Sequence, residues 1–328
     1  MTAVLIIGAA GMIGAKLTAR LARDGAVAGK AIDALTLADV VAAKVPEGAS
    51  FRVDSRAVDL SAPGAADGLI ASRPDVIFHL AAIVSGEAEA DFDKGYRVNL
   101  DGTRLLFEAI RKVGHGYKPR VVFTSSIAVF GAPFPDAIPD EFFHTPLTSY
   151  GTQKAIDELL LSDYTRRGFM DGIGIRLPTI CVRPGKPNKA ASSFFSGIIR
   201  EPLSGQEAIL PVPETVRHWH ASPRSAIGFL VHAAGLDGAK LGDRRNLSMP
   251  GVSATVAEQI GALARVAGEA VARRIRKEPD PIIQRIVAGW PQNFAPQRAP
   301  ALGFRAETNF EEIIRVHIAD ELGGTWVH

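Results

Sequence analysis

Residues 3–14 have the sequence AVLIIGAAGMIG, in which an apolar run is followed directly by three regularly spaced glycines. The run at 3–7 is too short to cross a membrane, and its continuous apolar character is typical of a buried parallel strand. Residues 15–23 have the composition of a helix. A strand, a glycine turn and a helix in this order are typical of a dinucleotide-binding loop, which makes a purely structural loop the weaker interpretation.

The glycines at positions 8, 11 and 14 each have a distinct use in such a loop. Gly8 permits the tight turn after the strand, Gly11 lets the backbone approach a pyrophosphate, and Gly14 allows close packing of the helix. The amino end of the helix, at Met12 and Ile13, supplies amide donors and the positive end of a dipole. These five residues are therefore predicted to bind the phosphates of a dinucleotide.

An acid ends the second expected strand, because residues 34–38 read ALTLA and Asp39 follows them. In dinucleotide-binding folds an acid at this place accepts hydrogen bonds from the adenosine ribose and repels a 2′-phosphate. Val40 and Val41 come next, so no arginine beside the acid can bind that phosphate. We therefore predict NAD rather than NADP as the cofactor. Without the glycines, Asp39 would be interpreted only as a strand-end or turn acid.

Further apolar runs alternate with helical stretches. This alternation predicts an α/β fold, a doubly wound parallel sheet, with a smaller C-terminal substrate-binding part. Ligands of such sheets bind beyond the carboxyl ends of the strands, where Ala81, Ser126 and Pro178 are expected. The strands are expected at residues 75–80, 120–126 and 172–177, and the helices at 96–111 and 149–167.

Tyr150 and Lys154 stand four residues apart in one expected helix, so the phenol and the ammonium share a helix face. A free phenol has a pKa near ~10 and is a poor base at neutral pH. A fixed cation beside it favours the phenolate, and lowering the pKa by ~3 units requires about 4 kcal/mol of differential stabilisation. The pair suits removal of a proton from an alcohol while hydride leaves for a nicotinamide. The spacing alone is common on solvated helices, so this prediction depends on the motifs upstream.

The composition agrees with a soluble enzyme of one or two domains. The chain has 328 residues, 47% of them hydrophobic, and its formal net charge of +2 is too small to indicate a nucleic-acid partner. No apolar run approaches the length of a membrane span, so no membrane association is expected. Cys181 is the single cysteine, which excludes an internal disulfide and suits a reducing cytoplasm, and its apolar neighbours predict a buried thiol. The histidines lack a clustered ligand pattern, so no metal site is expected.

Taken together, these motifs resemble the extended short-chain dehydrogenase/reductase family, which includes nucleotide-sugar epimerases and dehydratases. The matching residues follow the family's order through the first half of the chain. The resemblance implies a Rossmann fold, NAD as cofactor and a Ser/Tyr/Lys active site. The elements that carry it are Gly8, Gly11, Gly14, Asp39, Asp59-Leu60, His79-Leu80-Ala81-Ala82, Asn99 within VNLDGT (98–103), Ser126, Tyr150 and Lys154.

The resemblance also implies a role for each matching residue. Ser126 would hydrogen-bond the reacting oxygen, Tyr150 would be the acid/base, and Lys154 would hold the nicotinamide ribose. Asn99 would support the active-site backbone or a water relay, with a helix cap as the alternative. Asp59 has an alternative interpretation as a turn residue. The remaining cofactor contacts implied are Asp59 and Leu60 at the adenine, Leu80, Ala81 and Ala82 along the cofactor, and Pro178 and Thr179 at the carboxamide.

Two adjacent serines, Ser125 and Ser126, compete for the catalytic position. The segment SIAVFG (126–131) matches the family's S-x-x-x-Y-G pattern, with Phe130 in place of the usual tyrosine. Adjacent strand residues face opposite ways, so only one serine can readily face the site. Ser126 is therefore predicted to be catalytic and Ser125 structural.

The C-terminal half departs from the nucleotide-sugar pattern. Enzymes with those substrates usually carry G-D-G-x-x-x-R-D-F/W-x-H-V-D-D, whereas residues 212–226 read VPETVRHWHASPRSA. Arg217 is kept, but Pro223 and Arg224 replace two acids and the G-D-G is missing. The chain therefore resembles a branch of the family whose members oxidise the C2 hydroxyl of D-erythronate, a four-carbon sugar acid. This similarity covers almost the whole chain.

A small anionic sugar acid carries a carboxylate, which an arginine fork can bind bidentately. Arg183 and Arg217 are predicted to bind it, with His218 and Asn188 behind them. The alternative is that these arginines are surface or structural residues. Lys186, Lys189 and Arg224 would add cations near the mouth of the site, and Trp219 and Trp290 would either cap the pocket or pack in the core.

Residues 1–172 are expected to form the NAD-binding domain, with 217–236 returning to it, and residues 173–328 to form most of the substrate-binding domain. Prolines at 279, 281, 296 and 300 predict irregular connections near the end. The resemblance implies a homodimer that forms through the Tyr/Lys helix and the helix before it.

The leading expectation is an NAD-dependent dehydrogenase that converts D-erythronate into 2-oxo-tetronate, and two other classes of function remain open. A nucleotide-sugar epimerase or dehydratase would retain its cofactor through a full cycle, whereas a dehydrogenase releases NADH. A non-catalytic NAD-sensing protein would have little reason to keep the serine, the tyrosine and the lysine together.

Overall fold

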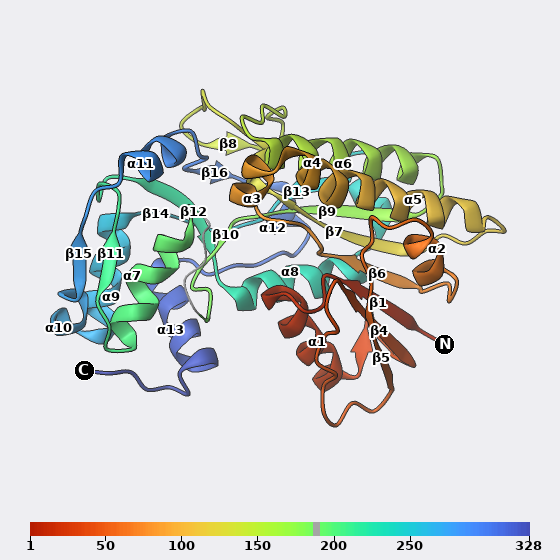
Figure 1. Ribbon diagram of the computed structural model, residues 1–328, viewed down its shortest axis with the longest axis horizontal. Helices are drawn as coiled ribbons and strands as arrows, with labels where there is room; N and C mark the ends of the chain where they lie inside the picture. The colour runs from red at the N-terminus through yellow and green to blue at the C-terminus, as the bar shows by residue number, and fades with distance from the viewer. Residues whose placement is uncertain (186–190) are drawn as a thin grey trace. The chain divides into compact units, whose positions relative to one another are not determined.

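The computed structural model describes residues 1–185 and 191–328, which divide into two compact units (Figure 1). Each unit is assembled from three separate stretches of the chain. Unit 1 comprises Met1–Val129, Thr148–Arg176 and Ile227–Ser248, and unit 2 comprises Phe130–Leu147, Leu177–Ala226 and Met249–His328.

Unit 1 is built on a seven-stranded parallel sheet with the strand order β13-β9-β7-β6-β1-β4-β5. The order changes direction at β1, which pairs with β4 on one side and with β6 on the other. Doubly wound folds bind dinucleotides at such a change of direction. The strands are β1 (Ala3–Ile7), β4 (Ala34–Asp39), β5 (Arg52–Ala57), β6 (Val76–His79), β7 (Arg120–Ser126), β9 (Asp171–Leu177) and β13 (Asn246–Ser248).

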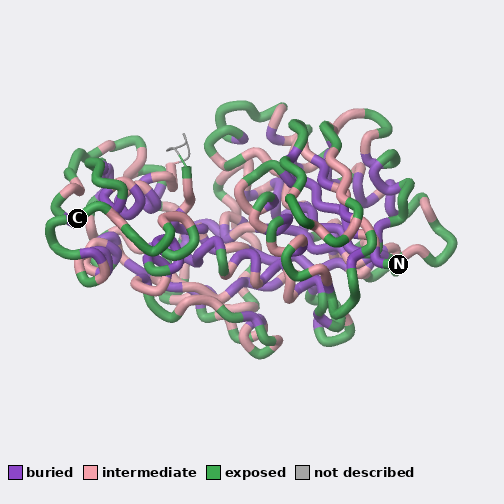
Figure 2. Tube along the Cα trace, turned by 90° about the horizontal axis from the view of Figure 1, so that it is seen from below, coloured by how far each residue is buried: buried purple, intermediate pink, exposed green. Residues whose placement is uncertain are grey.

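Helices cover both faces of this sheet, which confirms the predicted fold class (Figure 1). On one face, α5 and α6 pack against β1, β6 and β7 through buried side chains such as Phe107 and Leu161. α1 and α8 lie together on the other face, and the inner strands between these layers are mostly buried, whereas the edge strand β5 is not (Figure 2). The helices of unit 1 are α1 (Met12–Asp24), α2 (Ala65–Ile70), α3 (Ser85–Ala90), α4 (Phe92–Gly95), the π-helix η1 (Tyr96–Asp101), α5 (Gly102–Val113), η2 (Ile127–Val129), α6 (Ser149–Arg166), α8 (Pro223–Gly235) and η3 (Gly238–Leu241), and a hairpin joins β2 (Ala26–Val27) to β3 (Lys30–Ala31).

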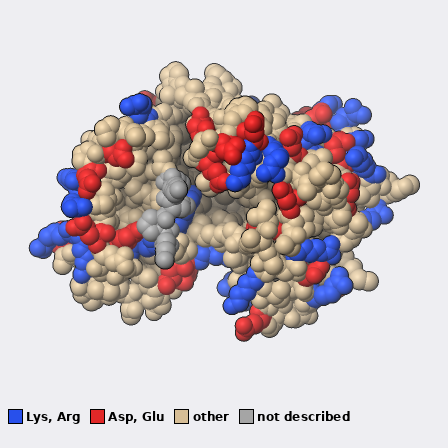
Figure 3. All heavy atoms as spheres, viewed as in Figure 1, with Lys and Arg blue, Asp and Glu red and all other residues tan. Residues whose placement is uncertain are grey.

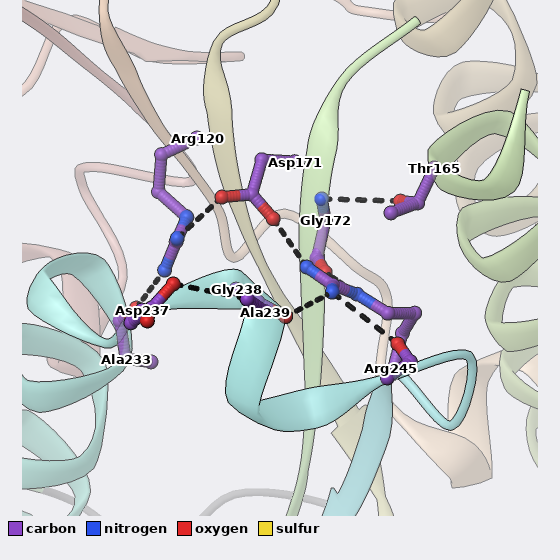
Figure 4. A network of polar contacts seen from close by, with 10 residues as sticks. Arg120, Thr165, Asp171, Gly172, Ala233, Asp237, Gly238, Ala239 and Arg245 are labelled. Carbon is purple, nitrogen blue, oxygen red and sulfur yellow. Dashed lines mark hydrogen bonds and ion pairs between the residues drawn. The ribbon is translucent and has the colours of Figure 1, made fainter. Parts of the chain in front are cut away.

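At the amino ends of β7 and β9, Asp171 lies between two arginines (Figure 4). Arg120 donates to one carboxylate oxygen of Asp171 and Arg245 donates to the other. Arg245 also donates to the backbone carbonyls of Gly172 and Gly238, at 2.7 and 2.6 Å. Because Arg245 belongs to the stretch that returns to unit 1 late in the sequence, these bonds fasten that stretch to the sheet.

Unit 2 has an apolar core of its own, to which α7, α9 and α13 contribute buried residues including Phe195, Leu263 and Ile314. Its three-stranded sheet places β12 between β10, which is parallel to it, and β14, which is antiparallel. The elements are β8 (Ile138–Pro139), β10 (Thr179–Ile180), α7 (Ser193–Leu203), β11 (Ala208–Leu210), β12 (Arg217–Ala221), β14 (Val252–Thr255), α9 (Val256–Ala267), α10 (Glu269–Ala272), β15 (Ile275–Lys277), α11 (Pro281–Ala288), β16 (Phe294–Ala295), α12 (Arg298–Ala301) and α13 (Phe310–Glu321).

The two units differ from the domain division expected from the sequence. Residues 130–147 belong to unit 2, and the returning stretch is 227–248 rather than 217–236. The reason for the later return is the pairing of the strands. β12 pairs with β10 and β14 inside unit 2, whereas β13 adds the edge strand to the sheet of unit 1.

The proline-rich end of the chain contains more regular structure than the sequence indicates. Pro281 starts α11, and the Asp280 side chain caps this helix by accepting from the amides of Ile282 and Ile283. Pro300 lies within the short helix α12. An aspartate followed by proline at the first helical position is a favourable helix start, so the expected irregular connection is wrong at Pro281.

Charged side chains of both signs are interspersed on the face of the molecule seen in Figure 3. Among the residues that the structure describes, no helix combines the length and the hydropathy that a membrane crossing requires.

Candidate active site

The glycine loop follows β1, and backbone atoms close it on two sides. Gly8 has a φ of 91°, and a Cβ on it would lie 2.6 Å from the amide nitrogen of Ala81. A Cβ on Gly14 would lie 2.1 Å from the carbonyl oxygen of Gly8. On Gly11 the nearest atom to a Cβ would be that same oxygen, at 3.5 Å, so the loop is open on this side. Met12 and Ile13 are half-buried in the first turn of α1, directly after this opening.

Asp39 stands at the carboxyl end of β4, where its carboxylate is joined to the glycine loop. One oxygen accepts from the amide of Ala10 at 2.9 Å, and the other accepts from the amide of Val40 at 2.7 Å. Val40 itself is 67% exposed. The structure therefore brings the expected ribose-binding acid to the loop predicted to bind the phosphates.

The segment after β6 lies beside the glycine loop, because the amide of Leu80 donates to the carbonyl of Ile7 at 2.8 Å. Leu80, Ala81 and Ala82 are all half-buried there. Leu60 is buried in the core between the sheet and its helices.

Asp59 has partners of its own within the chain. Its carboxylate accepts from the hydroxyl and the amide of Ser61 and forms an ion pair of 3.0 Å with Arg97. These contacts, the Ser61 hydroxyl first, lower the pKa of Asp59. An aspartate that accepts from the amide two residues later forms a turn. The turn that was the alternative interpretation of Asp59 is therefore present.

The two serines at the end of β7 have different surroundings. Ser125 is buried and donates to Glu158 of α6, whose carboxylate also accepts from Arg176 at 2.9, 3.1 and 2.7 Å. Ser126 is half-buried, and its hydroxyl oxygen accepts from the amide of Ala128 at 3.1 Å. The Ser125 hydroxyl is therefore bonded to the interior of the unit, whereas the Ser126 hydroxyl accepts a hydrogen bond from the turn that follows β7.

Tyr150 and Lys154 lie in the first two turns of α6, which begins where the Thr148 side chain caps the amide of Gly151. The Nζ atom of Lys154 lies 5.9 Å from the centroid of the Tyr150 ring and donates to the carbonyl of Thr124 at 2.9 Å. Lys154 is 2% exposed. This burial lowers the pKa of Lys154 to about 8, against the opposing effect of two acids on the same helix, Asp157 and Glu158. The buried amine therefore lies close to the phenol.

Asn99 lies inside the π-helix η1, a form that is rare and is frequent at functional sites. Its side-chain oxygen accepts from the amide of Ile83 at 2.9 Å, and its nitrogen donates to the Gln153 side chain at 2.7 Å. Asn99 therefore supports the backbone after β6 and joins it to α6. Its position inside the helix excludes the alternative role of a helix cap.

Three buried polar residues in this region were given no role from the sequence. The Nε2 atom of His79 lies 2.9 Å from the Thr103 hydroxyl, which in turn contacts the carbonyl of Asn99 and the carboxyl of Asp157. Burial raises the pKa of Asp157 well above its ordinary value and lowers the pKa of His79 to about 3. The available signal was the spacing of Asp157 and Lys154, three residues apart on one helix face.

The other predicted site residues belong to unit 2. Pro178 is buried just before β10, and the Thr179 hydroxyl lies 2.7 Å from Nε2 of His218. The Nε atom of Arg183 donates to the carbonyl of Ile180 at 3.3 Å. Asn188, Lys186 and Lys189 lie outside the described residues.

Two predicted cations already have acidic partners. Arg217, the first residue of β12, contacts Glu258 and the Ser253 hydroxyl, each at 3.3 Å. Arg224 forms an ion pair with Asp320. The structural alternative therefore describes the contacts of Arg217 in this structure.

The two tryptophans and the cysteine pack in the core of unit 2. Trp219 is 6% exposed and donates its indole hydrogen to the carbonyl of Met249 at 3.2 Å. Trp290 packs against the same core and lies 5.3 Å from the His218 ring. Burial raises the pKa of the Cys181 thiol to about 12. The core packing given as an alternative for the tryptophans, and the buried thiol predicted for Cys181, are both present.

Residues 4–220 match the sequence model of the NAD dependent epimerase/dehydratase family. The chain belongs to this family. The match includes the glycine loop as well as Tyr150 and Lys154, and it confirms the family that the motifs indicate.

Members of this family that resemble the chain carry two kinds of name. A D-erythronate dehydrogenase from Cupriavidus necator is 50% identical, covering 97% of this chain and 98% of the relative. A second D-erythronate dehydrogenase, from Haemophilus influenzae, is 44% identical, covering 96% and 98%. A crystal structure of a protein described as a nucleoside-diphosphate-sugar epimerase from Agrobacterium tumefaciens is 69% identical, with a TM-score of 0.97 over 98% of this chain and 95% of that one.

Family membership and these relatives establish an NAD-dependent oxidoreductase. The described residues fit the cofactor, because the loop is open only where Gly11 lacks a side chain and the amino end of the 13-residue helix α1 lies directly behind it. Amide groups at such a helix end bind phosphate oxygens. The predictions of an enzyme and of NAD are thus confirmed.

The buried histidines should make the fold sensitive to mild acid. Burial lowers the pKa of His79 to about 3, of His218 to about 4, and of His220 well below its ordinary value. At pH values between these lowered pKa values and the ordinary histidine pKa of ~6.5, the unfolded chain binds more protons than the folded one. The free energy of unfolding therefore falls as the pH falls. For His79 and His218 the loss should be about 2 kcal/mol each between pH 7.5 and 5.0, measured by urea unfolding.

The Asp157 carboxyl provides the control for this experiment. Its raised pKa means that the folded state holds a proton that the unfolded state releases, so Asp157 partly offsets the histidines on acidification. Asp157→Asn should therefore steepen the loss of stability. A wild-type protein equally stable at pH 5.0 and 7.5 would contradict the assignment of neutral buried histidines.

Proposed function

We propose that this protein oxidises the C2 hydroxyl of a small sugar acid, D-erythronate, to the 2-oxo acid 2-oxo-tetronate. The observation that carries the reaction type is the position of Tyr150 beside the buried amine of Lys154. The choice of substrate is supported by the two D-erythronate dehydrogenases that are similar along the whole chain.

The chemistry assigned to the catalytic residues is removal of one proton from the substrate alcohol. The charged Lys154 favours the Tyr150 phenolate, which takes the hydroxyl proton as the C2–H bond breaks. Ser126 donates its hydroxyl hydrogen to the reacting oxygen. Bound NAD supplies the acceptor for the hydride that leaves C2. Asn99 acts through the backbone at Ile83, as a positioning residue.

We assign the cofactor contacts on the same basis as the fit of the glycine loop. Gly8, Gly11, Gly14, Met12 and Ile13 would hold the pyrophosphate. The other contacts proposed are Asp39 and Lys154 at the two riboses, Asp59 and Leu60 at the adenine, Leu80, Ala81 and Ala82 along the dinucleotide, and Pro178 and Thr179 at the carboxamide.

The substrate carboxylate requires a cation, and Arg183 and Arg217 remain the two candidates. Glu258 already neutralises Arg217, and a carboxylate ligand would have to compete with it. Both arginines are therefore tested by substitution. An added charge-assisted hydrogen bond contributes about 1.5–3 kcal/mol, so replacing the arginine that binds the carboxylate by alanine should lower kcat/KM about ten- to a hundredfold.

A nucleotide-sugar epimerase is the second candidate, supported by the description of the 69% identical crystal structure. Pro223 and Arg224 replace two acids of the nucleotide-sugar pattern, which argues against binding of a nucleoside diphosphate. The weaker alternative, a non-catalytic NAD sensor, predicts no turnover of any alcohol.

We also propose a homodimer in the cytoplasm. The dimer would form through α5 and α6, where Leu159 of α6 is 62% exposed. A molar mass of about twice 34.9 kDa in light scattering would support it, and Leu159→Glu should lower that mass to the monomer's value. The cytoplasm is supported by the single, buried cysteine.

The decisive experiment measures NADH absorbance with D-erythronate, with the neutral polyol erythritol and with UDP-sugars. The proposal expects accumulation of NADH with D-erythronate alone, and a selective loss of this activity in Arg183→Ala or in Arg217→Ala. Comparable oxidation of erythritol would refute recognition through the carboxylate. Efficient conversion of a UDP-sugar without release of NADH would establish the epimerase instead.

A further inference from the structure

The hydrogen bond between Thr179 and His218 has a direction that the surrounding atoms determine. The Nδ1 atom of His218 lies 2.8 Å from the carbonyl oxygen of Pro291. A carbonyl oxygen only accepts hydrogen bonds, so Nδ1 must carry a hydrogen. The opposite ring atom, Nε2, lies 2.7 Å from the Thr179 hydroxyl.

The His218 ring is neutral, so Nε2 has a lone pair and no hydrogen. The ring is 3% exposed and stacks on Phe195, with centroids 5.2 Å apart and planes 4° apart. Trp290 lies 5.3 Å away on a tilted plane. This burial lowers the pKa of His218 to about 4. With Nδ1 as the donor to Pro291, Nε2 can only accept, and Thr179 must donate its one hydroxyl hydrogen to it.

We propose that His218 makes Thr179 an obligate hydrogen-bond acceptor toward its ligand, and thereby selects the amino side of the cofactor's carboxamide. This proposal rests on the proposed contact between Thr179 and that carboxamide. A hydroxyl whose hydrogen is committed retains only its lone pairs, so it receives an N–H and repels a carbonyl oxygen. His218 touches no ligand in this scheme and is a positioning residue.

The selection matters because the two ends of a carboxamide are nearly equal in size. One end is an NH2 donor and the other is an oxygen acceptor. A threonine with a free hydroxyl can bind either end by rotating its hydrogen, whereas Thr179 bound to His218 binds one. The discrimination is electrostatic. In the wrong orientation the carboxamide oxygen faces a lone pair of the Thr179 hydroxyl, and two acceptors repel each other.

The test compares the binding of NAD with that of its 3-acetylpyridine analogue, in which a methyl group replaces the NH2. Titration calorimetry of the protein alone gives the ratio of the two dissociation constants, without substrate or turnover. Thr179→Val supplies the baseline ratio, because valine has the shape of threonine without the hydroxyl. The wild-type preference for NAD should exceed this baseline about three- to tenfold, as expected for one lost hydrogen bond.

Two His218 variants separate the donor to Pro291 from the acceptor to Thr179. The amide of His218→Asn reaches the Nδ1 position only, so it keeps the bond to Pro291 and loses the acceptor. The longer amide of His218→Gln reaches the Nε2 position and restores an acceptor. We expect the asparagine variant to fall to the Thr179→Val baseline and the glutamine variant to keep the wild-type ratio, with thermal melting checking that both fold.

The outcomes distinguish failure of this inference from failure of the proposed contact. A wild-type ratio in His218→Asn, with Thr179→Val still lowering it, would overturn the role of His218. Equal ratios in wild type and Thr179→Val would show that Thr179 does not meet the carboxamide, which overturns both. Neither result depends on which sugar acid is the substrate.

Discussion

Tyr150→Phe should lower turnover at least a hundredfold while NAD binding stays within about twofold of the wild type. The phenylalanine retains the ring, so the packing at the start of α6 is kept. It removes the oxygen that takes the substrate proton in the proposed mechanism. General acid–base catalysis contributes typically ~10²–10⁴-fold, and the loss should appear in kcat. Steady-state kinetics with D-erythronate and calorimetry with NAD measure the two effects separately.

Tyr164→Phe is the matched control, because it makes the same chemical change on the same helix. The Tyr164 hydroxyl donates to Glu108, away from the residues assigned to catalysis. This variant should keep wild-type turnover. Near-normal turnover in Tyr150→Phe would remove Tyr150 from the role of base, and a loss in both variants would indicate a general disturbance of α6.

Gly11→Ala should fold normally and lose at least a hundredfold in NAD affinity. In this structure the added Cβ would meet its nearest atom at 3.5 Å, an ordinary contact. The methyl group would instead occupy the open side of the loop, where the backbone must approach the pyrophosphate. A thermal melt near that of the wild type, together with weak NAD binding in calorimetry, is the expected result.

Gly14→Ala should lower the stability of the fold itself. Its Cβ would lie 2.1 Å from the carbonyl oxygen of Gly8 and 2.7 Å from the Cα of Ala9, so the backbone must move. Such overpacking costs about 1–3 kcal/mol or more, and the melting temperature should fall. Gly68→Ala, in α2 with no atom within 4 Å of its Cβ, should change neither property. NAD affinity unchanged in Gly11→Ala would show that the pyrophosphate does not bind at this loop.

The cofactor half of the fold was accessible from the sequence because its signals are local. The strand expected at 120–126 is β7 without change, and the helix expected at 149–167 is α6 to within one residue. A buried parallel strand is a continuous apolar run, and a glycine loop has a spacing imposed by backbone contacts. The helix expected at 96–111 contains a π-helical turn. The turn could not be predicted, because the Asn99 side chain in it bonds a residue far along the chain, and a local sequence pattern does not show such a contact.

Unit 2 and the substrate side of the site were less accessible. The sequence gives the charge of an arginine but not its ion-pair partner. Glu258, the partner of Arg217, lies far from it along the chain. The same holds for His218, whose hydrogen-bond direction depends on a carbonyl at residue 291. Short strands such as β10 and β12 are defined by their pairing with each other. These features arise from long-range contacts, which composition and periodicity do not report.

The late return of residues 227–248 to the first sheet has a consequence for how the protein is made. When the ribosome has synthesised residue 176, the sheet still lacks its edge strand β13 and the guanidinium of Arg245 that grips Asp171. Unit 2 is in turn incomplete until α13 has emerged near the end of the chain. Domains generally fold as units during synthesis. Here unit 1 cannot be finished before the first two stretches of unit 2 have been translated, so the nascent chain must carry a sheet without its edge strand until residue 248.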